Sequence, residues 1–148
     1  MCIFSATADG KRSNFNPPRS RKSTTNFAVL GEQVEKVQID LESHPGYDSG
    51  TSIATFIAAG IAALVIDFSR QEEGKKIIVD QERLKTVAGM KEIFAEMADG
   101  GDDGGYDGLV PQRVLECSKP DVRKRGLAAR RAYIAETISR DLDKANKG

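Results

Sequence analysis

The sequence predicts a mainly α protein with one transmembrane helix, an extended N-terminal arm and a small C-terminal helical region. Residues 51–66, TSIATFIAAGIAALVI, carry no charge and no proline. The chain before them shows little hydrophobic periodicity, whereas apolar residues after them recur at spacings of three and four, as in amphipathic helices. We therefore divide the chain into an arm (1–48), a transmembrane helix (49–69) and a soluble helical region (70–148).

The transmembrane helix is predicted from length and hydropathy. Mean hydropathy over Gly50–Phe68 exceeds the usual threshold for a span, whereas the whole chain averages −0.41. With its flanks the helix has about 22 residues, or about 33 Å, against a hydrocarbon core about 30 Å thick. Asp48 and Asp67 would then lie near the two interfaces. A buried helix in a soluble domain is the alternative, but only 39% of the chain is hydrophobic and Trp is absent, so little apolar chain is left to surround it.

Small and bulky residues divide the surface of this helix. Ala59, Gly60 and Ala63 would let a second helix approach closely, which is what drives helix association in lipid. Bulky residues such as Phe56 and Leu64 occupy the remaining surface. We expect one face for a protein partner and the other for lipid or pigment.

The N-terminal arm is polar and basic. Between Gly10 and Gly31 there are five basic residues and no acidic residue, a composition typical of organellar transit peptides. So few apolar side chains cannot offset the entropy of ordering the arm. We therefore expect the arm to lie on a partner, anchored by side chains such as Phe4, Phe27 and Val29.

Three helices are expected after the span. The first runs between Asp80 as N-cap and Gly100 as stop, with apolar residues on one side. A short helix starts at Pro111, because proline suits a first helical turn. The last helix runs over residues 120–144.

The acidic segment Asp99–Gly108 is a candidate calcium loop. A loop of the EF-hand type starting at Asp103 would use Asp107 at position 5, but it has Gly105 at position 3 and Val114 at position 12. Two side-chain ligands are therefore missing. A solvated, glycine-rich connector is the alternative reading.

His44 is the only histidine and lies close to the predicted membrane interface. In a pigment-carrying complex its imidazole could ligate chlorophyll or haem; an ordinary loop histidine is the alternative. One histidine cannot build a catalytic triad or a two-histidine zinc site. Because the chain also lacks Walker A, GxGxxG and GxSxG patterns, we expect no enzymatic activity.

A basic run in the last helix is the candidate anionic-partner site, and it comprises Arg123, Lys124, Arg125, Arg130 and Arg131. It would face anionic headgroups or an acidic partner, or simply solvent. Nucleic acid is disfavoured because the net charge is zero and no aromatic residues interleave the run.

These features predict a non-catalytic, single-span accessory subunit that links or stabilises parts of a large membrane complex. In layout the chain resembles small peripheral subunits of algal photosystems and, more distantly, supernumerary subunits of mitochondrial respiratory complexes. The first resemblance implies a thylakoid membrane in a chloroplast, no cofactor of its own, and chlorophyll or carotenoid at the membrane face. Basic residues gather after the span, so the C-terminal region should face the stroma or cytoplasm.

Two alternatives stay open. One is a soluble helical binding module that buries residues 51–66 and turns its basic run toward an acidic partner. The other is a calcium-responsive adaptor that uses the acidic segment. Membrane extraction distinguishes the first from a span, and calcium titration tests the second.

Overall fold

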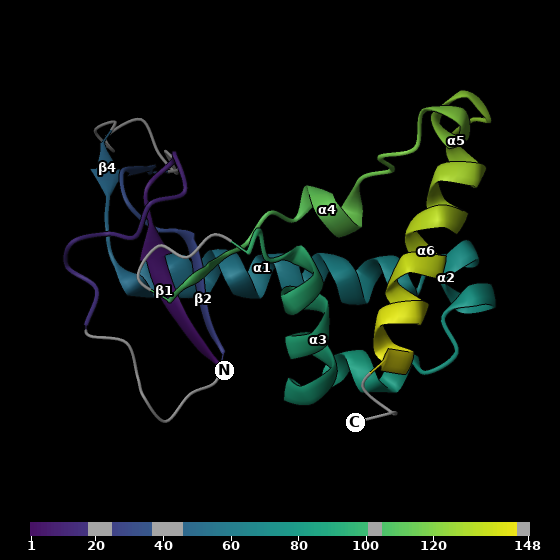
Figure 1. The fold of residues 1–148 in the computed structure, drawn as a ribbon, viewed down its shortest axis with the longest axis horizontal. Helices are drawn as coiled ribbons and strands as arrows, with labels where there is room; N and C mark the ends of the chain where they lie inside the picture. The colour runs from purple at the N-terminus through teal and green to yellow at the C-terminus, as the bar shows by residue number, and fades with distance from the viewer. Residues whose placement is uncertain (18–24, 37–45, 101–104, 145–148) are drawn as a thin grey trace. The chain divides into compact units, whose positions relative to one another are not determined.

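The computed structural model describes residues 1–17, 25–36, 46–100 and 105–144 (Figure 1). About 54% of the described residues are helical, which confirms the mainly α class. The chain divides into two compact units, Met1–Gly60 with Asp99–Leu109, and Ile61–Ala98 with Val110–Gly148. Each unit is described below by itself.

The described elements comprise six α-helices, one 3₁₀ helix and five strands. The helices are α1 (Thr51–Ser69), α2 (Glu72–Ile77), η1 (Gln81–Lys85), α3 (Val87–Met97), α4 (Gln112–Leu115), α5 (Pro120–Lys124) and α6 (Leu127–Lys144). The strands are β1 (Cys2–Ala6), β2 (Asn26–Leu30), β3 (Val34–Glu35), β4 (Tyr47–Asp48) and β5 (Asp107–Gly108).

The first unit contains a parallel sheet in the order β1-β2-β5. Figure 1 shows β1 and β2 side by side. Cys2 lies opposite Asn26 at one end of the β1–β2 pair, and Phe27 lies opposite Asp107 on the other side of β2. Part of the predicted arm therefore pairs with its own chain, which the sequence analysis did not foresee. Binding of the arm to a partner stays a prediction.

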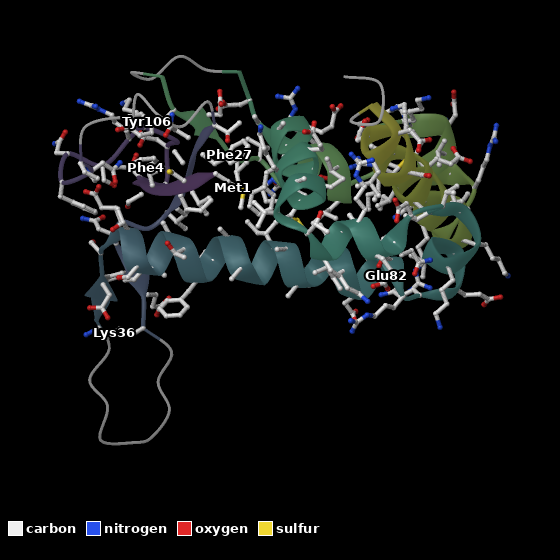
Figure 2. The ribbon with its side chains drawn as sticks, turned by 90° about the horizontal axis from the view of Figure 1, so that it is seen from below. Met1, Phe4, Phe27, Lys36, Glu82 and Tyr106 are labelled. Carbon is white, nitrogen blue, oxygen red and sulfur yellow. The ribbon has the colours of Figure 1, made fainter. Side chains whose placement is uncertain are left out.

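One face of the sheet carries a small aromatic core. Phe4, Ala6 and Ala28 are buried there with Tyr106, which meets Phe4 edge to face at a ring separation of 4.7 Å. The Tyr106 hydroxyl donates to the carbonyl of Pro17 at 3.0 Å. Figure 2 shows Phe4 and Tyr106 next to each other at the sheet. These contacts supply the apolar burial that we had expected from a partner.

The opposite face of the sheet meets the first turn of α1. Gly50 N–H donates to the carbonyl of Gly31 at 2.7 Å, and Gly31 leaves no room for a side chain because Ala54 and Ser5 lie against it. A methyl group there would lie 2.8 Å from Ala54 Cβ. The start of α1 is thus held directly beside the end of β2.

The outer edge of β1 is closed by the chain itself. Asn16 Oδ1 accepts from the Ser5 N–H at 3.0 Å, and Asn16 Nδ2 donates to the Ser5 carbonyl at 2.6 Å. The Ser13 N–H adds a second bond to the same carbonyl at 3.0 Å. The Asn16 amide therefore replaces the peptide of a missing neighbouring strand, which protects this edge from pairing with another chain.

Removing this amide should destabilise the first unit. We expect Asn16→Ala to lower the free energy of unfolding by about 1–3 kcal/mol, because the N–H of buried Ser5 loses its hydrogen-bond partner. Asn14→Ala changes a nearby exposed asparagine and should leave stability within about 0.5 kcal/mol. Urea unfolding followed by circular dichroism measures both, and equal losses in the two variants would contradict this account of Asn16.

The second unit packs α6 against α2, α3, α4 and α5. Its buried apolar side chains come mainly from η1, α3, α4 and α6 and include Leu84, Ile93, Phe94, Met97, Val114, Ala135, Ile138 and Leu142. The Arg83 guanidinium donates to the Leu142 carbonyl at 3.0 Å and so caps the last turn of α6.

Two of the predicted helices are interrupted. The helix expected after Asp80 divides into η1 and α3 at Thr86, whose hydroxyl accepts from Gly89 N–H at 3.1 Å and caps α3. The helix expected over residues 120–144 divides at Gly126, which has φ of 94°. Glycine adopts this left-handed conformation readily and commonly ends a helix.

Candidate interaction surface

Helix α1 has one covered side and one bare side. Ala54, Ala58, Val65 and Ser69 are buried and recur at helical spacing along the covered side. On the bare side Phe56 is 75% exposed and Leu64 is 61% exposed. We call the strip formed by Phe56, Gly60, Ala63 and Leu64 the bare face of α1.

The predicted helix-packing residues lie away from the covered side. Ala59, Gly60 and Ala63 are all exposed in the described part of the chain. Ala54 and Ala58 are the small residues that allow close packing within the chain. Contact of Ala59, Gly60 and Ala63 with a second helix therefore stays a prediction about another molecule.

Helix α1 is long and apolar enough to cross a membrane. Within the described residues it is the one helix that meets this criterion, and only 17% of its most apolar window is buried. The core helix of a soluble protein can meet the same criterion of length and hydropathy, but such a helix is mostly buried. The described residues therefore leave most of this window of α1 uncovered.

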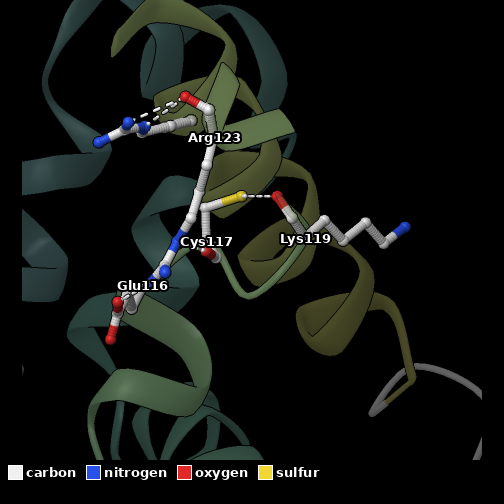
Figure 3. Close-up of polar contacts among 5 residues, drawn as sticks. Glu116, Cys117, Lys119 and Arg123 are labelled. Carbon is white, nitrogen blue, oxygen red and sulfur yellow. Dashed lines mark hydrogen bonds and ion pairs between the residues drawn. The ribbon is translucent and has the colours of Figure 1, made fainter. Parts of the chain in front are cut away.

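Part of the predicted basic site has local structural roles. The Arg123 guanidinium donates to the Cys117 carbonyl at 2.7 Å and pairs with Glu116, as Figure 3 shows. Arg130 donates through two nitrogens to the Arg123 carbonyl, at 2.9 and 3.2 Å, and so holds α5 against α6. Arg131 lies 3.9 Å from Glu73.

Lys124 and Arg125 are the members of the basic run that point to solvent. Both are exposed, and in the described part of the chain their side chains make no ion pair or hydrogen bond. Arg130 donates to a carbonyl oxygen, which does not neutralise a guanidinium, whereas Arg123 is paired with the Glu116 carboxylate. The surface at the start of α6 is therefore basic, and its binding of an acidic partner stays a prediction.

The candidate calcium loop has a different form in the part that is described. Asp107 belongs to strand β5 and pairs with β2, while Asp103 lies outside the described residues. Across the described ranges, no group of three His, Cys, Asp or Glu side chains lies close enough to hold a metal. Calcium binding by Asp103 and Asp107 stays a prediction.

The candidate pigment ligand, His44, also lies outside the described residues. Sequence reasoning placed Tyr106 in a flexible loop, whereas the structure buries it to 2% exposure. The sequence did contain a signal for this burial, namely an aromatic residue within a run of Gly and Asp. A large aromatic ring gains more free energy from burial than its small or charged neighbours do.

Comparisons with known proteins add no family assignment. No protein-family model, curated protein or solved structure shows a significant match to this chain.

Proposed function

We propose that this protein is a non-catalytic accessory subunit, and that α1 supplies the apolar surface that joins it to a larger assembly. The supporting observation is the bare face, where Phe56 and Leu64 stand exposed on a helix that carries no charge between Thr51 and Ile66. Contiguous exposed apolar surface marks sites of contact with another protein or with a membrane. Burying these two side chains would contribute about 3 kcal/mol in total.

In its membrane form, this subunit crosses a bilayer once. The 19 residues of α1 span about 28 Å, close to the hydrocarbon thickness. The assembly would then be a photosynthetic complex of the thylakoid, with lipid, chlorophyll or carotenoid against the bare face and the C-terminal region on the stromal side. The alternative within the membrane form is a supernumerary subunit of a mitochondrial respiratory complex.

In its soluble form, the subunit docks in water on a protein partner. The contacts at the start of α1 favour this form, because Gly31 and Gly50 hold the first turn beside a parallel sheet. Open sheet edges exposed to lipid do not occur within the hydrocarbon region. The basic surface around Lys124 and Arg125 would add contacts with an acidic partner.

Alkaline carbonate extraction distinguishes the two forms. Membranes from cells that express the full chain are washed with carbonate and sedimented. A spanning protein stays in the pellet, whereas a peripheral or soluble protein moves to the supernatant. Recovery in the supernatant would exclude the membrane form and leave the soluble form standing.

A double substitution on α1 tests the proposal itself. We expect Phe56→Ser with Leu64→Ser to weaken association with the assembly about 100-fold, since about 3 kcal/mol of apolar burial is lost. Val79→Ser with Val87→Ser is the matched control, because both valines are exposed but lie outside α1. Size fractionation of native extracts measures the fraction in the assembly, and equal behaviour of the two variants would refute a docking role for α1.

A further inference from the structure

Gly60 occupies the centre of the bare face, and the described residues of its own chain give no packing reason for a glycine there. A side-chain carbon added at Gly60 would meet nothing within 4 Å. Glycine inside a helix is less stable than alanine, so a residue that no internal contact requires weakens α1. A missing side chain does allow the backbone of another helix to approach closely.

The large residues of the bare face are placed symmetrically about Gly60. Phe56 precedes it by four residues and Leu64 follows it by four. A twofold rotation through Gly60 would therefore set Phe56 of one chain against Leu64 of another. The same rotation sets Ala63 against Ile57, so small residues meet larger ones. A twofold contact requires such a self-complementary surface.

Charge favours the antiparallel arrangement. Asp67 is exposed in the last turn of α1, where the helix dipole is unfavourable for a carboxylate. The first turn of α1 contains no acidic residue. In an antiparallel pair, Asp67 of one chain would lie near Ile53 of the other, at the positive helix end. A parallel pair would instead bring the two Asp67 carboxylates together.

From these observations we infer that α1 binds α1 of a second copy of this chain, antiparallel and centred on Gly60. This inference rests on the soluble form of the proposed function and names a partner for the bare face. A helix apolar on all sides needs cover on all sides in water. The chain covers one side itself, and a second copy would cover the other.

Disulfide trapping with purified full-length protein tests the pairing. A mixture of Phe56→Cys and Leu64→Cys chains should form a cross-linked heterodimer under mild oxidation, at least tenfold faster than Phe56→Cys alone. In the antiparallel pair, two copies of position 56 lie roughly 12 Å apart along the axis, too far for a disulfide. The unsubstituted chain, which already contains Cys2 and Cys117, supplies the background. Faster cross-linking of Phe56→Cys alone would indicate parallel helices and overturn the inference.

Light scattering on size-exclusion fractions gives an independent measurement. The unsubstituted chain should be dimeric, and Gly60→Leu should raise the dimer dissociation constant at least tenfold. Thr55→Leu places the same leucine side chain at an exposed position of α1 away from the bare face and should leave the constant unchanged. A monomer at all concentrations would overturn the inference. The proposed function would still stand in that case if the Phe56→Ser, Leu64→Ser chain were lost from its assembly in native extracts.

Discussion

Gly31→Ala should lower the free energy of unfolding by about 3 kcal/mol, the upper range for overpacking a filled site. The added methyl group would lie 2.8 Å from both Ala54 Cβ and Ser5 Oγ, and 2.9 Å from the Gly50 carbonyl oxygen. These neighbours belong to α1, β1 and the segment before α1. Because atoms pack against this position from several directions, the sheet and the helix would have to move apart to make room for the methyl group.

Gly46→Ala is the matched control for Gly31. Among the described residues, a methyl group at Gly46 would meet the Lys36 side chain, at 3.8 Å. We expect a change in stability within about 0.5 kcal/mol for this variant. Urea unfolding followed by circular dichroism compares the two, and a Gly31→Ala protein as stable as the control would show that α1 does not pack on β2 as described.

Phe94→Ala should destabilise the second unit by about 3–5 kcal/mol. Phe94 is 1% exposed on α3, a helix that packs against η1, α4 and α6. Truncation removes the transfer free energy of the ring and leaves a cavity that fixed helices cannot fill. Amide hydrogen exchange should accelerate along α3 and α6 first, because these helices share the core.

Val87→Ala is the control on the same helix. Val87 is 69% exposed, so its truncation should leave stability within about 0.5 kcal/mol. If Phe94→Ala matched Val87→Ala in urea unfolding, Phe94 could not belong to the core of this unit. A loss confined to Phe94→Ala would establish that the C-terminal helices form a core of their own.

Substitutions on the bare face of α1 should affect docking, unlike the substitutions in the two interiors. Positions 31 and 94 report on packing inside each unit, whereas Phe56 and Leu64 contribute little to either interior. Substitutions on the bare face should therefore change association with little effect on unfolding. This separation lets docking be measured without loss of the fold.

Most of the helices could be predicted from the sequence, but α2 was not, and the helices expected after Asp80 and Pro120 were each predicted as continuous. The uncharged run between Thr51 and Ile66 predicted α1, and spacings of three and four predicted helices in the C-terminal region. Both signals are local, because helical hydrogen bonds and side-chain faces involve residues three or four apart. The breaks at Thr86 and Gly126 were not predicted. Each break depends on the backbone conformation of a single residue, which the spacing of apolar residues does not indicate.

The strand pairing of the sheet, and the division of α1 into a covered side and a bare face, became visible only in the folded chain. Pairing of Cys2 with Asn26 and of Phe27 with Asp107 joins positions far apart in the chain, where no short pattern can indicate it. Residues 51–66 are apolar on every side, so their hydropathy could not show which side the chain would cover. That choice follows from Gly31, whose missing side chain admits Ala54 and thereby leaves Gly60 facing outward.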